Sequence, residues 1–137
     1  MILVSMSQDA IYSGWDRLRA GILECANKTG ALYKPEDVYM RLRAGTAWAY
    51  AIKNHGDDLG FTILTQEFDC DGLALFIWIL WAEPLSLRGD ESAVYGELER
   101  IAREIKAKRI RMHSPRPGWA REPFFNQVAI VYEHEVT

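Results

Sequence analysis

The stretch LALFIWILWA, from Leu73 to Ala82, decides how this chain folds. It is apolar at every position, so a strand built from it needs cover on both of its faces. The run has about half the length that a bilayer-spanning helix requires. It therefore predicts a central strand of a sheet that has helices on both sides.

Two further strands are expected immediately before this stretch. Gly60–Phe68 leads into it through a turn that ends in Asp71-Gly72, a strong hairpin signal. Before that, Thr46–Lys53 alternates large residues with small ones. The small residues are Ala47, Ala49 and Ala51, and the large ones are Trp48, Tyr50 and Ile52. We expect a helix pressed against the alanine face, and we expect Trp48 in the core.

A helix, a fourth strand and a loop are expected after the stretch. Asp90 to Lys108 carries an apolar helical face, with acidic residues at its start and lysines at its end. Arg109–Ser114 then alternates as a strand, which a crossover helix makes parallel to Leu73–Ala82. The loop from Ser114 to Trp119 follows, and Val128–Val136 is predicted as the last strand.

Helices are expected before the sheet. Residues 8–27 show one apolar stripe, formed by Ile11, Trp15, Leu18, Ile22 and Cys25. Packing on the sheet explains this stripe, and the alternative is a dimer seam, because the spacing also fits a short heptad. Residues 35–44 predict a second, short helix with proline and acidic residues in its first turn.

Composition restricts the possible functions. The 137 residues fit one domain, 1–137, with a net charge of −3 and without the basic excess of a general nucleic-acid or membrane binder. No signal segment is recognisable, so we expect an intracellular protein. Cys25 and Cys70 have no metal-binding spacing, and we expect both to be reduced and no metal site. The histidines are scattered, and solvated side chains are their default interpretation.

The element order resembles the GNAT fold of N-acetyltransferases over about Pro35 to Val136. The resemblance implies an α+β domain with a mixed sheet, an antiparallel three-strand meander, a crossover helix and helices on both faces. The helix 8–27 would pack on or beside it. In that family, a glycine-bearing loop before the crossover helix binds the pyrophosphate of coenzyme A.

The corresponding loop here departs from the family motif. It runs from Glu83 to Ser92 and contains one glycine, so Arg88 and Gly89 are only weak candidates for cofactor binding. Asp90 and Glu91 stand where the phosphates would lie, and we expect them to repel a pyrophosphate and to satisfy the helix dipole themselves. We therefore expect no cofactor.

The catalytic residues of the family are also hard to find. Glu83 could act as a general base by its position at the end of the strand, or could be a polar residue where the strand leaves the core. The family often supplies a tyrosine after the fourth strand, and residues 120–125 contain none.

A narrower resemblance points away from catalysis. The loop Ser114–Trp119, the later Val131-Tyr132-Glu133 and the segment from Pro35 to Trp48 are similar to small GNAT-like proteins of tailed bacteriophages. That resemblance implies a non-catalytic virion or assembly component, located in the host cytoplasm and the virion. Its partners would be other virion proteins or a second copy. The alternative is an acetyl-CoA-dependent N-acetyltransferase.

Two surface features complete the predictions. Arg116, Trp119 and Arg121 predict a protein interface, because tryptophan and arginine are common hot-spot residues, and the alternative is that Trp119 folds back onto the sheet. Arg109, Arg111 and Arg116 could contact nucleic acid. The alternative is a solvated face balanced by nearby carboxylates. We expected these carboxylates to be Glu97, Glu99, Glu104 and Glu122.

Overall fold

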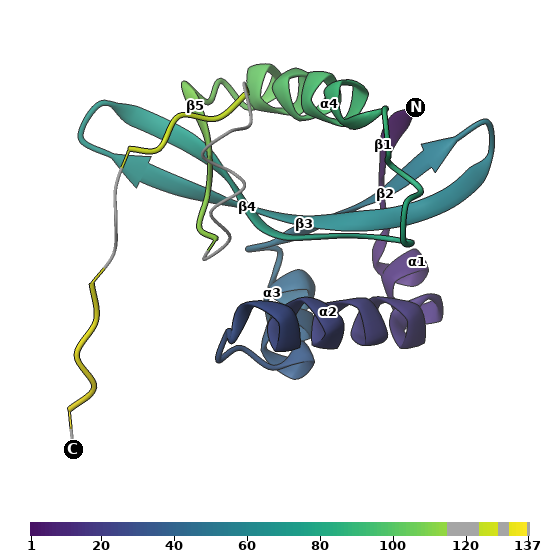
Figure 1. Ribbon diagram of the computed structural model, residues 1–137, viewed down its shortest axis with the longest axis horizontal. Coiled ribbons are helices and arrows are strands. Elements are labelled where there is room, and N and C mark those ends of the chain that lie inside the picture. The colour runs from purple at the N-terminus through teal and green to yellow at the C-terminus, as the bar shows by residue number, and fades with distance from the viewer. Residues whose placement is uncertain (115–123, 129–131, 137) are drawn as a thin grey trace.

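The fold is a five-stranded sheet between two layers of helices (Figure 1). The computed structural model describes residues 1–114, 124–128 and 132–136. Its strands lie in the order β1-β2-β3-β4-β5. They are β1 (Ile2–Ser5), β2 (Trp48–Asn54), β3 (Asp57–Asp69), β4 (Gly72–Ala82) and β5 (Arg109–Met112).

Helices cover both faces of this sheet, as the sequence predicts. Helices α1 (Gln8–Ser13), α2 (Trp15–Thr29) and α3 (Pro35–Ala44) lie on one face, and α4 (Glu91–Glu104) lies on the other (Figure 1). No helix in the described part of the chain has the length and apolar character to cross a membrane.

The strand pairing confirms the predicted meander and crossover. β2, β3 and β4 pair antiparallel in sequence order, and β5 pairs parallel to β4 after the chain has crossed through α4. The sequence analysis missed β1, which adds an antiparallel edge to β2 with Leu3 opposite Ile52. A four-residue strand is too short to show a clear alternation.

The first predicted helix is two helices in the structure. It breaks at Gly14, which is both the C-cap of α1 and the N-cap of α2. The predicted stripe nevertheless faces the sheet, since Ile11, Leu18 and Ile22 are all buried there. These three residues of the stripe therefore pack on the sheet, as the packing interpretation predicts.

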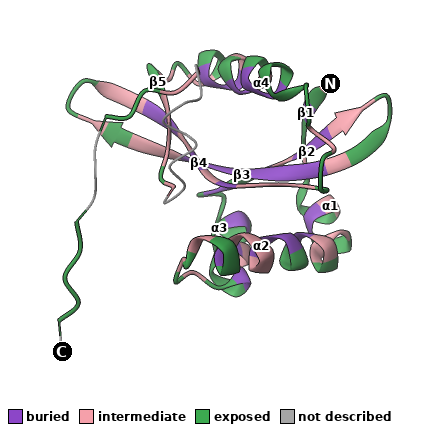
Figure 2. Ribbon diagram, in the orientation of Figure 1, coloured by how far each residue is buried: buried purple, intermediate pink, exposed green. Residues whose placement is uncertain are grey.

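The core has one half on each face of the sheet (Figure 2). Ala49 of β2 and Ala47 just before it face the layer of α1, α2 and α3, as predicted, and lie in the same buried cluster as Val38 and Leu42. Trp48 points the other way and is 37% exposed, so its predicted place in the core is wrong.

The predicted C-terminal strand is not found in the described residues. Residues 126–128 and 132–136 adopt no strand, and Val128 and Tyr132 are 80% and 88% exposed. Just before them, Phe124 stacks on the buried Tyr95 of α4 with 4.6 Å between the ring centroids. Phe124 thus lies on the α4 face of the sheet.

Candidate functional site

The sheet opens between its two parallel strands. β4 pairs with β5 only from Ala74 to Ile77, opposite Arg109 to Met112. Beyond Ile77, β4 continues to Ala82, and no described strand pairs with it on that side. Within the described residues, the backbone groups along this edge have no strand partner, although one carbonyl of this stretch, that of Leu80, accepts from Cys25 Sγ at 3.6 Å.

A β-bulge marks the point where the opening begins. Ile63 of β3 lies opposite Ile79 and Leu64 lies opposite Ile77, so Trp78 is the extra residue on β4. The bulge places Trp78 and Ile79 on the same face, toward α2 and α3, while Ile77 and Leu80 both face α4. A bulge of this kind bends the strand and turns it away from its neighbour.

Aromatic side chains line the α2 and α3 face of this opening. The ring of Trp78 has an edge contact with Tyr33 at 5.7 Å, and the guanidinium of Arg41 lies 4.9 Å from its centroid. Burial, followed by the nearby Cys25, raises the pKa of Tyr33 to about 12. Tyr33 therefore stays protonated at neutral pH and is a poor base.

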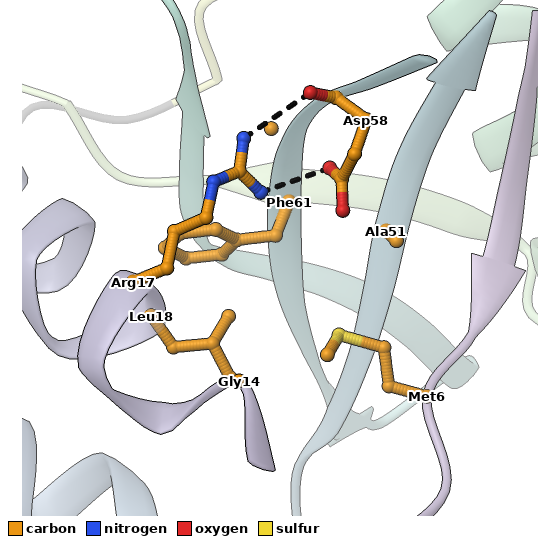
Figure 3. Close-up of a pocket in the computed structure, with 8 residues that line it drawn as sticks. Met6, Gly14, Arg17, Leu18, Ala51, Asp58 and Phe61 are labelled. Carbon is orange, nitrogen blue, oxygen red and sulfur yellow. Dashed lines mark hydrogen bonds and ion pairs between the residues drawn. The ribbon is translucent and has the colours of Figure 1, made fainter. Parts of the chain in front are cut away.

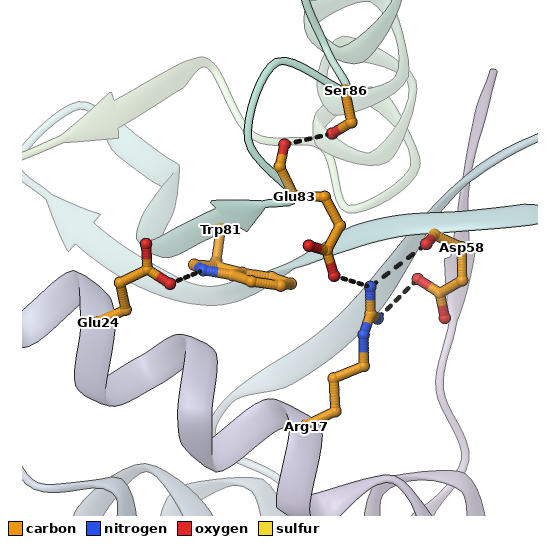
Figure 4. A network of polar contacts seen from close by, with 6 residues as sticks. All are labelled: Arg17, Glu24, Asp58, Trp81, Glu83 and Ser86. Carbon is orange, nitrogen blue, oxygen red and sulfur yellow. Dashed lines mark hydrogen bonds and ion pairs between the residues drawn. The ribbon is translucent and has the colours of Figure 1, made fainter.

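A polar network ties the carboxyl end of β4 to α2 (Figure 4). The Arg17 guanidinium lies 2.9 Å from Asp58 Oδ1 and 3.5 Å from Glu83 Oε1, and it covers the Trp81 ring at 5.3 Å from its centroid. Trp81 Nε1 in turn donates to Glu24 Oε2 at 2.8 Å. Hydrogen bonds from Lys28 and then from Trp81 hold the pKa of Glu24 below its ordinary value.

Glu83 is part of this network. It directly follows β4, its side chain is 51% exposed, and its ion pair with Arg17 orients the carboxylate toward α2. The structure therefore brings Glu83 to the end of the open edge. Among the described residues, Asp58 is the other acid that shares Arg17 with it.

Two cavities flank the sheet. A pocket of about 70 Å³ lies between α2 and the β2–β3 end of the sheet (Figure 3). Its lining residues are Met6, Gly14, Arg17, Leu18, Ala51, Asp58, Gly60 and Phe61. A space of that size holds a few waters and no acceptor substrate. A cavity of about 220 Å³ on the α4 face has only apolar and aromatic lining, from Trp48 to Ile105.

The loop that follows β4 exposes backbone donors at the start of α4. Gly89 has a φ of 86°, a conformation that suits glycine, and residues 88–93 are exposed. The N–H groups of Gly89, Glu91 and Ser92 reach no acceptor within the described residues. Asp90 occupies the N-cap position, and its side chain makes no capping hydrogen bond. Asp90 and Glu91 can therefore balance the helix dipole through their charge, but Asp90 does not cap a backbone N–H.

The arginines of β5 are paired with carboxylates of the β3–β4 hairpin. Arg109 lies 2.5 Å from Asp71, and Arg111 pairs with Asp69 and, at 3.9 Å, with Glu67. Arg109 accordingly lowers the pKa of Asp71. The balancing carboxylates are thus on β3 and in its turn rather than on α4. These pairs favour a balanced surface over a phosphate-binding one.

Several predicted residues fall beyond the described part of the chain. Arg116, Trp119 and Arg121, the predicted interface, lie outside it, and so does Glu122.

One of the scattered histidines lies at the opening of the sheet. His113 directly follows β5, and its ring has an edge contact with Phe76 at 4.9 Å. Only the pairing register shows that this position lies at the opening.

Comparisons with known proteins support the fold. No family model matches this sequence, and no curated protein matches it. Solved structures do match. A protein described as a probable acetyltransferase superposes with a TM-score of 0.70 at 17% identity, over 100% of this chain and 97% of its own. An aminoglycoside acetyltransferase from an uncultured soil metagenomic sample gives 0.67 at 15% identity, over 98% and 97%.

A third structure was solved with a ligand. AAC(6')-Iy in complex with the bisubstrate analogue CoA-S-monomethyl-acetylneamine gives a TM-score of 0.66 at 13% identity, over 98% of this chain and 97% of its own. These likenesses establish a GNAT-like fold for the chain.

The comparisons also correct the functional expectation. A non-catalytic bacteriophage structural protein was expected, and the similar structures include proteins named as acetyltransferases, with nothing that supports a phage origin or a virion role. The expectation was wrong because it relied on short loop segments. The alternative, an acetyl-CoA-dependent enzyme, is the better supported of the two.

Proposed function

We propose that this protein is an acetyl-CoA-dependent N-acetyltransferase. One observation carries the proposal: β4 loses its β5 neighbour after Ile77 and runs on, with no described strand on that side, to a loop that ends at the exposed start of α4. An extended ligand with an anionic end fits this arrangement, because one part of it can pair with a strand edge while the other meets free backbone donors.

The open edge of β4 fits the pantetheine arm of coenzyme A. That arm is extended and contains two amide groups, so it can hydrogen-bond to the edge from Trp78 to Ala82 as a short neighbouring strand would. The bulge at Trp78 keeps β5 away from this edge. The sheet itself thus leaves room for the arm.

The start of α4 can bind a pyrophosphate through its backbone donors, although two carboxylates beside them weaken the attraction. The free N–H groups of Gly89, Glu91 and Ser92 and the positive end of the helix dipole favour an anion, and Arg88 adds a positive charge beside them. The carboxylates of Asp90 and Glu91 oppose it. We therefore expect binding that is weaker than this geometry alone would give.

Acetyl-CoA would supply the acetyl group as a thioester, and the acceptor would be an amine. The chain must then orient the amine and accept the proton that its nitrogen loses. Glu83 remains a candidate for that proton acceptor on position, at the end of β4 and paired with Arg17.

Calorimetric titration with acetyl-CoA tests the proposal. We expect saturable binding, and we expect Ser92→Glu to weaken it by roughly tenfold, because a third carboxylate would then stand among the backbone donors. Gly96→Glu is the matched control. It adds the same charge at an exposed position of the same helix where a side chain meets nothing within 4 Å. Absence of binding at millimolar acetyl-CoA, or equal effects of the two substitutions, would rule out this site.

A further inference from the structure

We propose that His113 is the catalytic base of the transfer reaction. This inference rests on the proposed function and assigns a role that the fold alone does not give. His113 is the first residue after β5, and β5 ends where its partner β4 begins to bulge. The side chain therefore stands at the inner end of the opening.

The register fixes the face on which His113 lies. Phe76 is the partner of Arg111, and paired residues of parallel strands point to the same face, so Arg109, Arg111 and His113 all share the face of Phe76. The 4.9 Å edge contact between the rings of Phe76 and His113 agrees with this assignment. Trp78 is on this face too, so His113 and the bulge residue flank the same point.

His113 and Glu83 lie at opposite ends of the opening, so the thioester can be close to only one of them. At about 3.3 Å per residue, Glu83 lies about 16 Å along the strand from Trp78. Pyrophosphate held at the start of α4 would lie near Glu83, and the thioester is at the far end of the pantetheine arm. An arm that follows β4 inward would thus bring the thioester toward Trp78 and His113 and away from Glu83.

The surroundings of His113 are polar and nearly balanced in charge. On its own strand, Arg109 and Arg111 face the same way and are neutralised by the hairpin carboxylates Asp71, Asp69 and Glu67. From α3, Arg41 lies over Trp78. The imidazole itself is exposed, so an acceptor amine can approach it from solvent.

The proposed step is balanced in atoms and charge. His113 in its neutral form takes one proton from the amine nitrogen as that nitrogen forms its bond to the acetyl carbon. The bond between the acetyl carbon and sulfur breaks, and the imidazolium then returns the proton to the departing sulfur. The products are the acetylated amine and the free thiol, and His113 is regenerated.

Histidine modification tests this placement without an acceptor substrate. The full chain is treated with diethylpyrocarbonate, and mass spectrometry follows modification at each histidine. We expect saturating acetyl-CoA to slow modification of His113 at least fivefold. His55, in the β2–β3 turn, and His134 are exposed internal controls and should not change.

A truncated ligand sharpens the test. Adenosine 3',5'-bisphosphate lacks the pantetheine arm, so it should leave His113 unprotected even where calorimetry shows that it binds. If acetyl-CoA binds and His113 reacts as fast as before, the assignment of His113 is wrong while the proposed function stands. If acetyl-CoA does not bind at all, the proposed function fails, and this inference fails with it.

Kinetics with a primary amine supply the second readout. Spermidine, kanamycin and a lysine-containing peptide serve as probes. We expect His113→Gln to lower kcat by about 10²-fold or more, to leave acetyl-CoA affinity within about twofold, and to remove the rise of kcat between about pH 6 and 8. His55→Gln is the control. A His113→Gln enzyme that keeps the wild-type pH profile would overturn the proposal, as would an acetyl-CoA complex that none of the three amines discharges.

Discussion

Gly21 of α2 lies so close to Phe61 of β3 that a Cβ on this glycine would stand 2.6 Å from the Phe61 ring carbon Cε1. Trp81 of β4 would be 2.9 Å away on the other side. The absence of a side chain therefore lets α2 sit directly on two aromatic rings that are themselves stacked at 5.5 Å. This close approach positions α2, and with it Arg17, at the end of the open strand edge.

The first prediction concerns this contact. We expect Gly21→Ala to lower the free energy of unfolding by about 1–3 kcal/mol, because the methyl group forces the rings or the helix to move. Gly96→Ala in α4 is the matched control, since its Cβ would meet nothing within 4 Å. It should raise stability by about 0.5–1 kcal/mol through helix propensity. Urea unfolding of both variants measures the difference, and the same sign for both would contradict this account.

The second prediction concerns Glu97 and pH. Glu97 accepts hydrogen bonds from Arg100 and from the backbone N–H of Leu3, both at 2.9 Å. The Arg100 bond is the largest cause that holds the pKa of Glu97 below its ordinary value of 4.5. Because the folded pKa is the lower one, this stabilisation is present above about pH 4.5 and is lost as pH falls through the folded pKa.

The variant Glu97→Gln tests this relation. Its stability deficit relative to the native chain should be full at pH 7 and should shrink steadily below about pH 4.5. Glu99→Gln is the control, because its ion pair with Arg103 is long, at 3.6 Å, and exposed. Thermal unfolding from pH 3 to pH 7 provides the measurement. If the stability lost in Glu97→Gln does not vary with pH, the negative charge of Glu97 does not contribute to stability.

The third prediction concerns the carboxylates at the start of α4. The double change Asp90→Asn and Glu91→Gln should strengthen acetyl-CoA binding by roughly two- to tenfold, because it removes two negative charges beside the phosphate donors. The gain should shrink at 0.5 M salt, since exposed charges are screened. Glu99→Gln, farther along the same helix, should change nothing. Calorimetry at two salt concentrations decides the matter, and unchanged affinity would place the phosphates elsewhere.

The fourth prediction concerns Glu83. If it serves mainly as a partner of Arg17, Glu83→Gln should lower kcat by less than about tenfold, whereas a general base contributes about 10²–10⁴-fold. Its effect on stability should be below about 1 kcal/mol, because the pair is exposed. Steady-state rates with the three amine probes provide the comparison with His113→Gln. A larger loss for Glu83→Gln would return the role of base to Glu83.

Local patterns predicted most of the fold. The doubly apolar Leu73–Ala82, the Asp71-Gly72 turn and the helix after Asp90 each have a signal that depends only on neighbouring residues. Together they give the meander, the crossover and the two helical layers that the structure shows. The strand β1 was missed because its four residues are too few to show an alternation, and its partner β2 is far away in the sequence. The apolar stripe runs on across Gly14, so it gave no sign of the break there.

The candidate site was harder to predict because it depends on where pairing stops. The residues of β4 do not predict that its pairing with β5 ends at Ile77, or that a β-bulge lies at Trp78. The pairing register of β4 and β5 is what places His113 at the opening. For Val128–Val136 the error is of the opposite kind, because the sequence predicts a strand there and the described residues of this segment adopt none.

The N-terminal strand depends on residues that are far away in the sequence. Arg100 donates to the Leu3 carbonyl at 3.3 Å, and Glu97 accepts from the Leu3 N–H, so α4 holds both sides of one residue of β1. During synthesis, β1 therefore leaves the ribosome long before the helix that secures it. We expect the nascent chain to keep β1 unprotected from proteases until residues beyond Arg100 have emerged, and to depend on chaperones most strongly during that interval.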